Sequence, residues 1–183
     1  MKVSKSTWIS FALLILIAAL YRAIPGRPWG FAPQLAMAVF GGAVLSRKLS
    51  FTLPLLSMLV SDIFYEILYI NGLTPISGFY DGMWLNYVLI LSLTTVGFFT
   101  NSKSVLSIAK SALVAPTLYF FVSNSLTWLG NGGYQRSRDF SGYVQTLIDG
   151  IPFYTNSLLA TYVFSVFLFG TYHWVAKTQL KLS

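Results

Sequence analysis

Two carboxylates stand one helical turn apart in an otherwise apolar segment, since residues 51–70 read FTLPLLSMLVSDIFYEILYI and include Asp62 and Glu66. Their spacing of four residues places both on one face of a helix. A charged side chain in a lipid environment is costly and usually faces the interior of a helix bundle or a watery cavity. The pair is therefore either structural, with Arg22 or Arg27 as partners, or part of a cavity that binds the polar groups of a substrate.

A second group of polar residues lies near the ends of three later apolar segments. Asn124 and Trp128 are four residues apart and share a helix face, and Asn156 follows a proline at the start of the last segment. A segment near residue 85 adds Trp84 and Asn86 as weaker candidates. A few polar groups among aromatic side chains are typical of a small-molecule pocket. Alternatively, Asn124 bonds a neighbouring helix and Trp128 belongs to an interfacial aromatic belt.

The composition excludes a water-soluble protein, because 55% of the 183 residues are hydrophobic and only 9% are charged. A soluble domain has about 25% charged residues. The net charge of +7 is spread over short basic clusters between apolar segments, which indicates membrane topology and not nucleic-acid binding.

Catalytic motifs are missing from the sequence. The chain has no cysteine and one histidine, His173, which lies far from the polar residues above. It contains no HExxH sequence, P-loop or glycine-rich nucleotide fingerprint. We therefore expect no catalytic residues, no metal site and no cofactor.

Six segments are long and apolar enough, or nearly so, to cross a bilayer core, which takes about 20 residues each. We expect one integral membrane domain over residues 1–183, with a first helix that is retained and not cleaved as a signal peptide. The expected spans are about 7–24, 33–46, 50–70, 83–100, 108–129 and 152–176. The sequence thus predicts an all-α membrane protein with a bundle of six transmembrane helices.

Basic residues set the orientation of this bundle. Alternate termini and loops carry eight of them: Lys2, Lys5, Arg47, Lys48, Lys103, Lys110, Lys177 and Lys181. The other side carries four, together with three acids: Arg22, Arg27, Arg136, Arg138, Asp81, Asp139 and Asp149. The positive-inside rule therefore places both termini in the cytoplasm and the polar candidates in the outer half of the bundle.

The loops expected outside are the longer ones, at 25–32, 71–82 and 130–151. Within the last, SGYVQTLID is expected to form a short helix capped by Ser141. Loops 71–82 and 130–142 are expected to gate a pocket, and Arg136 and Arg138 either attract an anionic ligand or are ordinary solvated charges.

Four short motifs carry a resemblance that runs from about residue 30 to 172. They are Pro33 before small residues, Ser61-Asp62, Asn124 with Trp128, and Pro152-Phe153 with Asn156. With six short spans, the sequence resembles the substrate-binding S components of energy-coupling factor (ECF) vitamin transporters. It is similar, more closely, to small bacterial membrane proteins of the S-component type, and among these to the solitary cobalamin transporters.

The resemblance implies a multi-pass protein of the bacterial inner membrane that binds a small micronutrient outside and moves it inward. A vitamin such as cobalamin is the implied substrate, and an ECF-type coupling subunit with its ATPases is an implied partner. S components dock on the coupling subunit through small residues at helix spacing. Two pairs of alanines, Ala19 with Ala23 and Ala32 with Ala36, have this spacing. The alternatives are a structural subunit of a membrane complex, or an enzyme that uses Asp62 and Glu66 as an acid/base pair.

Overall fold

A computed structural model describes residues 15–18, 20, 21, 24, 26–130 and 132–181, without the side chains of 175–181. Residues 15–18, 20 and 21 are helical. Most of the remaining first expected span lies outside the described residues, together with Lys2, Lys5, Ala19, Arg22 and Ala23, and so do the side chains of Lys177 and Lys181.

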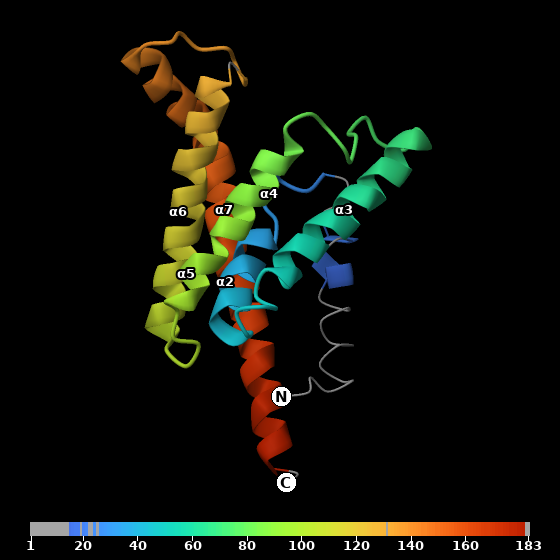
Figure 1. The fold of residues 1–183 in the computed structure, drawn as a ribbon, viewed down its shortest axis with the longest axis vertical. Helices are drawn as coiled ribbons and strands as arrows, with labels where there is room; N and C mark the ends of the chain where they lie inside the picture. The colour runs from blue at the N-terminus through green and yellow to red at the C-terminus, as the bar shows by residue number, and fades with distance from the viewer. Residues whose placement is uncertain (1–14, 19, 22–23, 25, 131, 182–183) are drawn as a thin grey trace.

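Six helices follow along the described chain, and all regular elements in it are helical (Figure 1). Their bounds are α2 Gln34–Val44, α3 Thr52–Ile70, α4 Met83–Ser92, α5 Thr94–Phe98, α6 Val105–Leu129 and α7 Phe140–Lys181. The predicted all-helical class is confirmed.

Three helices are long and apolar enough to cross a membrane. They are α3, α6 and the part of α7 from Phe140 to Trp174. The remaining apolar helices are shorter, at Gln34–Val44 and over Met83–Phe98, where α4 and α5 follow each other directly. These lengths are consistent with a membrane protein.

Helix α2 is the centre of the structure and contacts each of the other five helices. Every residue from Gln34 to Gly41 is buried, so this short helix is enclosed on all sides. A helix that is apolar around its whole circumference fits such a position. In Figure 1, α6 and α7 run side by side along one flank of α2, while the far end of α3 leans away on the other flank.

Glycines allow the closest helix contact, between α2 and α5. A Cβ on Gly42 would overlap the carbonyl oxygen of Thr94, and a Cβ on Gly97 would overlap that of Val39. Small residues at helix crossings let backbones approach each other in this way. The Gly41-Gly42 pair, which lowers helix propensity, is thus explained by packing.

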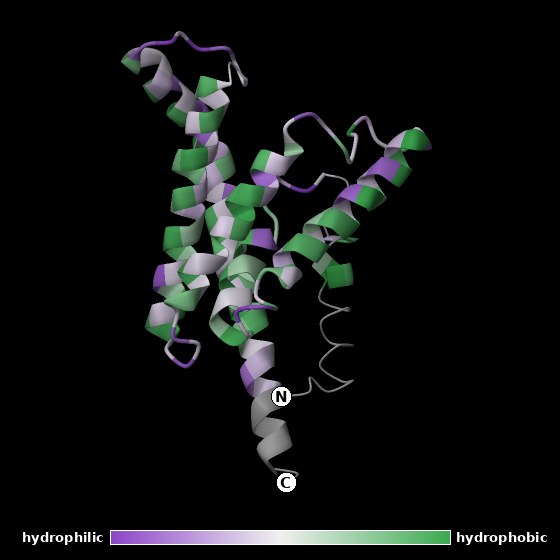
Figure 2. Ribbon diagram, viewed as in Figure 1, coloured by the Kyte–Doolittle hydropathy of each residue, from purple (hydrophilic) through white to green (hydrophobic). Residues whose placement is uncertain are grey.

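The helices divide the loops between two ends of the molecule. One end carries loops 26–33, 71–82 and 132–139, and we call it the long-loop end. The other end carries the shorter loops 45–51 and 99–104. Figure 2 shows hydrophilic residues gathered in the loops and in the half of α3 that is nearer to the long-loop end.

The last helix differs from the prediction, because α7 is continuous from Phe140 to Lys181 and contains Pro152 in its interior. The expected start at residue 152 and the separate helix capped by Ser141 are wrong. The cap is Asp139, whose carboxylate oxygen Oδ1 accepts a hydrogen bond of 2.7 Å from the amide of Gly142. Pro152 cannot donate a backbone hydrogen bond, and a proline inside a helix favours a bend. Figure 1 shows that α7 changes direction near the long-loop end.

The expected fourth segment, 83–100, is also interrupted. It is divided at Leu93 into α4 and α5, and the amide of Leu93 is shared between the carbonyl oxygens of Leu89 and Ile90, at 3.3 and 3.2 Å. Hydroxyls next to the break bond the backbone, with Ser92 donating to Leu89 at 2.6 Å and Thr95 donating to Ser92 at 2.7 Å. Such local bonds compete with helix continuation.

The Gly42–Gly97 contact predicts a selective loss of stability. The Gly42→Ala variant is expected to lower the free energy of unfolding by about 1–3 kcal/mol, because the added methyl group forces α2 and α5 apart. The measurement is thermal unfolding of the purified protein in detergent. The matched control is Gly170→Ala, since a Cβ there meets no atom within 4 Å and alanine favours a helix. Equal melting temperatures for the two variants would contradict the packing role.

Candidate functional site

The carboxylate of Asp62 is buried between α3 and α4. Its side chain is 4% exposed, and its Oδ2 atom accepts a hydrogen bond of 2.6 Å from the hydroxyl of Tyr87. Asp62 and Tyr87 each also take part in at least one further hydrogen bond, ring contact or electrostatic interaction. A buried carboxylate with a short hydrogen bond from a phenol is a strongly polar point in an otherwise apolar bundle.

An apolar layer lies directly beneath this carboxylate, on the side away from the long-loop end. It is formed by buried residues of three helices, α2, α3 and α4, and by the residue after α4: Leu35, Ala38, Met58, Ile90 and Leu93. Tyr87 and Tyr119 pack against this layer from α4 and α6. The layer closes the bundle below the polar residues.

One helical turn from the apolar layer, toward the long-loop end, each of the three helices carries polar residues. They are Gln34 on α2, Ser61 and Asp62 on α3, and Tyr87 on α4. Each stands three or four residues from a member of the layer, which is the spacing of one turn. We call these four residues the central polar group.

Two members of the central polar group are buried without a hydrogen-bond partner. The Nε2 atom of Gln34 and the Oγ atom of Ser61 are inaccessible to solvent, and their residues are 4% and 0% exposed. Buried polar atoms in proteins are nearly always paired, and an unpaired one costs about 1–3 kcal/mol. The structure therefore contains unused hydrogen-bonding capacity close to the apolar layer.

The predicted residues Asn86 and Trp84 lie on α4 but play different parts. The Oδ1 atom of Asn86 accepts a hydrogen bond of 2.7 Å from the hydroxyl of Tyr119, which joins α4 to α6 beside the apolar layer. Trp84 is 63% exposed and no hydrogen bond of its ring is seen within the described chain. Only Asn86 is thus brought near the central polar group.

Glu66 holds loop 71–82 on α3. Its Oε2 atom accepts hydrogen bonds from the hydroxyl of Ser77 at 2.9 Å and from the amides of Gly78 and Phe79 at 3.0 and 3.2 Å. A Cβ on Gly78 would overlap the carbonyl oxygen of Asp62, so the loop backbone lies directly on the helix at that residue. The carboxylate of Glu66 thus clamps the loop, while that of Asp62 is buried below it.

Asn124 and Asn156 hold other parts of the structure together. Asn124 donates to the carbonyl oxygen of Phe120 at 2.7 Å and packs so closely on Gly150 of α7 that a Cβ there would overlap its amide. Asn156 donates to the carbonyl oxygen of Trp29 at 2.9 Å, which fixes loop 26–33 on α7. The hydrogen bonds of both side chains thus go to backbone carbonyl oxygens of α6 and of loop 26–33.

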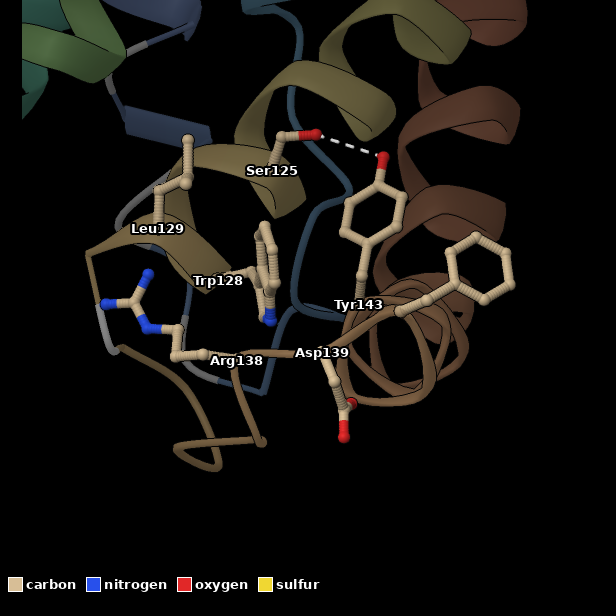
Figure 3. A pocket seen from close by; sticks show the side chains of 7 residues that line it. Ser125, Trp128, Leu129, Arg138, Asp139 and Tyr143 are labelled. Carbon is tan, nitrogen blue, oxygen red and sulfur yellow. Dashed lines mark hydrogen bonds between the residues drawn. The ribbon is translucent and has the colours of Figure 1, made fainter.

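Trp128 lines a hollow of about 430 Å³ at the long-loop end of α6, shown in Figure 3. The hollow is lined by residues of α6, α7 and the loop between them: Ser125, Trp128, Leu129, Arg138, Asp139, Phe140 and Tyr143. The guanidinium of Arg138 lies 5.8 Å from the centre of the Trp128 ring, and the ring of Tyr143 lies 5.4 Å away on the opposite side. The indole nitrogen donates to the carbonyl oxygen of Ser137 at 2.8 Å.

Electrostatic contacts fix the loop around this hollow. The amide of Gly142 and the hydroxyl of Ser137 stabilise the carboxylate of Asp139 and lower its pKa. Arg136 forms a two-point ion pair with Asp149, at 2.8 and 3.0 Å, and the hydrogen bond to this carboxylate raises the pKa of the guanidinium. The two arginines of the loop therefore differ, because Arg138 has no ion pair within the part of the chain that the structure describes.

The residues predicted from the sequence thus fall into separate places. Asp62 and Asn86 lie at the central polar group or beside it, Glu66 clamps a loop, and Trp128 lines the hollow. Sequence reasoning missed Gln34 and Tyr119, although a glutamine directly after Pro33, at the head of an apolar helix, was a usable signal. Among the described residues, no three His, Asp or Glu side chains gather as a metal site would need.

The described helices and the buried polar residues between them define an all-helical protein with three helices able to cross a membrane. The chain belongs to the family of unknown function DUF6580, whose sequence model matches residues 2–182. No curated protein and no solved structure matches it. The resemblance to S components therefore stays a prediction.

The bond between Tyr87 and Asp62 predicts a loss of stability in Tyr87→Phe. We expect the free energy of unfolding to fall by about 1–3 kcal/mol, because the variant removes the phenol that donates to a buried carboxylate oxygen. Thermal unfolding in detergent measures the effect. Tyr134→Phe is the matched control, since Tyr134 is 75% exposed and its ring contact with Arg136 survives the change. A Tyr87→Phe protein as stable as the control would show that this bond is dispensable.

The clamp at Glu66 predicts a local effect on loop 71–82. In Glu66→Ala, the amide of Gly78 is expected to exchange with solvent at least tenfold faster, because it loses the only acceptor seen for it in the described structure. The amide of Phe79 loses one of two acceptors, since it also donates to the hydroxyl of Ser77 at 3.2 Å, and a smaller increase is expected there. Hydrogen exchange followed by mass spectrometry over this loop measures the change. Asp81→Ala removes a carboxylate from the same loop, where it is exposed, and is expected to leave exchange unchanged. Unchanged exchange in both variants would refute the clamp.

Proposed function

We propose that the chain is a six-span membrane protein that binds a small polar molecule at the central polar group and moves it across the membrane. The arrangement has both termini in the cytoplasm and the long-loop end outside, and the membrane is the bacterial inner membrane. The observation that carries the proposal is the burial of Gln34 and Ser61 with unpaired polar atoms, one helical turn from the apolar layer above which Asp62 also lies.

The energetics of a membrane favour this interpretation. Polar groups between apolar helices are expensive, and in membrane proteins they mark positions where a substrate, ion or water is held. Gln34 offers two amide donors and Ser61 a hydroxyl, and Asp62 adds the negative charge of a carboxylate that is itself held by Tyr87 and by a further interaction. The apolar layer and the rings of Tyr87 and Tyr119 supply walls suited to a heterocyclic ligand.

Loops at the long-loop end supply a movable cover in this proposal. Loop 71–82 is held by one carboxylate, that of Glu66, and lies on the backbone of Asp62. Gly72 and Gly82, with φ of +68° and +77°, stand near its two ends and provide backbone conformations that allow the chain to turn sharply. Release of the single clamp would open the way to Asp62 from outside.

The ligand class follows from the resemblance together with these groups. A vitamin is the first class to test, with cobalamin included, and an ECF-type coupling subunit with ATPases is the proposed source of energy. The clamp also weighs against an acid/base pair of Asp62 and Glu66, because Glu66 is occupied by three donors of the loop. Transport is thus the function that the arrangement of polar groups supports best.

The test is thermal stabilisation of the full chain, purified in detergent, by a panel of vitamins. A ligand at 100 times its dissociation constant stabilises by about 2.7 kcal/mol, which raises the melting temperature by roughly 5–10 °C. This increase is expected to disappear in Asp62→Asn and to persist in Asp81→Asn, the same substitution in an exposed loop position. Ser61→Ala is a second variant that removes one ligand contact if Asp62→Asn does not fold.

Uptake of the stabilising vitamin into proteoliposomes, with the coupling subunit and ATPases where these copurify, then measures transport. Two results would overturn the proposal. One is a panel without any stabilising compound together with a stoichiometric copurifying membrane protein, which would indicate a structural subunit. The other is stabilisation that Asp62→Asn and Ser61→Ala both retain, which would place the ligand elsewhere.

A further inference from the structure

The hollow beside Trp128 shares no residue with the central polar group. We propose that it binds an anionic phospholipid, with the headgroup phosphate at Arg138 and an acyl chain along the apolar wall. The contacts of the hollow, its depth along α6 and the charge of its loop point to this occupant.

The position of the hollow along α6 matches the depth of lipid phosphates. Between Lys110 and Trp128 the helix carries no charged residue, and at 1.5 Å per residue this stretch is about 27 Å long. A bilayer hydrocarbon core is about 30 Å thick. With Lys110 at one interface, Trp128 therefore lies at the other, at the level where headgroups begin.

The walls of the hollow are apolar on the side that faces outward. Leu129 is 58% exposed and Phe140 is 81% exposed, and both line the hollow at the junction of α6 and α7. Large exposed apolar side chains of this kind at the end of a spanning helix suit an acyl chain. Trp128 and Tyr143 present aromatic bodies with polar tips, which favour the headgroup region.

Among the described residues that line the hollow, Arg138 is the one cation, and its exposed guanidinium is available to a phosphate. It contacts the face of Trp128, which leaves its N–H groups unused within the described chain. No ion pair joins it to its neighbour Asp139 within the described chain, where that carboxylate is held by bonds from Gly142 and Ser137. Figure 3 shows the carboxylate and the guanidinium pointing in different directions, with the guanidinium on the Leu129 side of Trp128.

A membrane lipid fits these features better than a soluble anion. A free phosphate would use Arg138 alone, and one exposed guanidinium against a bulk-water background binds it weakly. A phospholipid adds the contact of its chain with Leu129 and Phe140, and it is present at high local concentration at this depth. Guanidinium groups bind phosphate by two parallel hydrogen bonds, for which Arg138 has the geometry and lysine does not.

The experiment is native mass spectrometry of the full chain in detergent, titrated with phosphatidylglycerol or phosphatidylcholine of identical acyl chains. Wild-type protein is expected to bind phosphatidylglycerol about fivefold more tightly, which is the effect of one basic residue near an anionic lipid surface. Arg138→Gln is expected to remove this preference. The control, Lys103→Gln, removes an exposed positive charge from loop 99–104, at the other end of α6 and outside the hollow, and is expected to keep it.

Further arms separate the lipid from other occupants. Leu129→Ser is expected to weaken binding of both lipids, and glycerol phosphate at equal concentration is expected not to displace phosphatidylglycerol. Melting temperatures of all variants verify their folding. Equal binding of the two lipids, an Arg138→Gln protein that keeps the preference, or full displacement by glycerol phosphate would each overturn the proposal.

Discussion

The enclosure of α2 is the constraint on which the rest of the structure depends. This helix of 11 residues contacts all five other helices, which is possible only because small side chains let neighbouring backbones come close. At the Gly42–Gly97 crossing no side chain separates α2 from α5. The same packing buries Gln34, the first residue of α2, because the apolar and small residues that follow it are enclosed by the other helices.

In a membrane, an unpaired buried polar atom costs more free energy than in the core of a soluble protein. Water cannot reach such atoms from the hydrocarbon side, so each polar atom has to find its partner within the protein or in a bound molecule. Asp62 has Tyr87, and Asn86 has Tyr119. Within the described chain Gln34 and Ser61 have none, and the proposed binding position rests on this asymmetry within one group.

Much of the fold could be predicted from the sequence, because apolar length and helix-breaking loops are local signals. The helices expected from residues 50 and 108 lie close to where α3 and α6 begin. The extent of α7 could not be predicted, because a proline is a local signal for a helix end, whereas Pro152 lies inside a helix of 42 residues that packs along α6, with a 2.9 Å bond between Thr117 and Tyr154. Likewise, the break between α4 and α5 at Leu93 is accompanied by hydrogen bonds from the hydroxyls of Ser92 and Thr95 to the backbone, which a hydrophobicity pattern does not reveal.

The site was predictable only in part, for a related reason. Spacing placed Asp62 and Glu66 on one helix face, but their different roles arise from residues far along the chain, at Ser77 and Tyr87. Asn124 and Asn156 have the residue types of a ligand site, yet their partners are Gly150 and the backbone of Trp29. Which polar residue is used for packing and which for binding depends on tertiary contacts that composition and spacing do not contain.

Because Gly78 lies against the backbone of Asp62, the position of loop 71–82 is coupled to the surroundings of the buried carboxylate. Displacement of the loop breaks the bonds to Glu66 and also uncovers the helix at Asp62. A molecule that binds Asp62 more tightly under the closed loop must therefore stabilise closure by the same free energy by which closure strengthens its binding. Binding in the interior would then change how often the loop at the surface is closed.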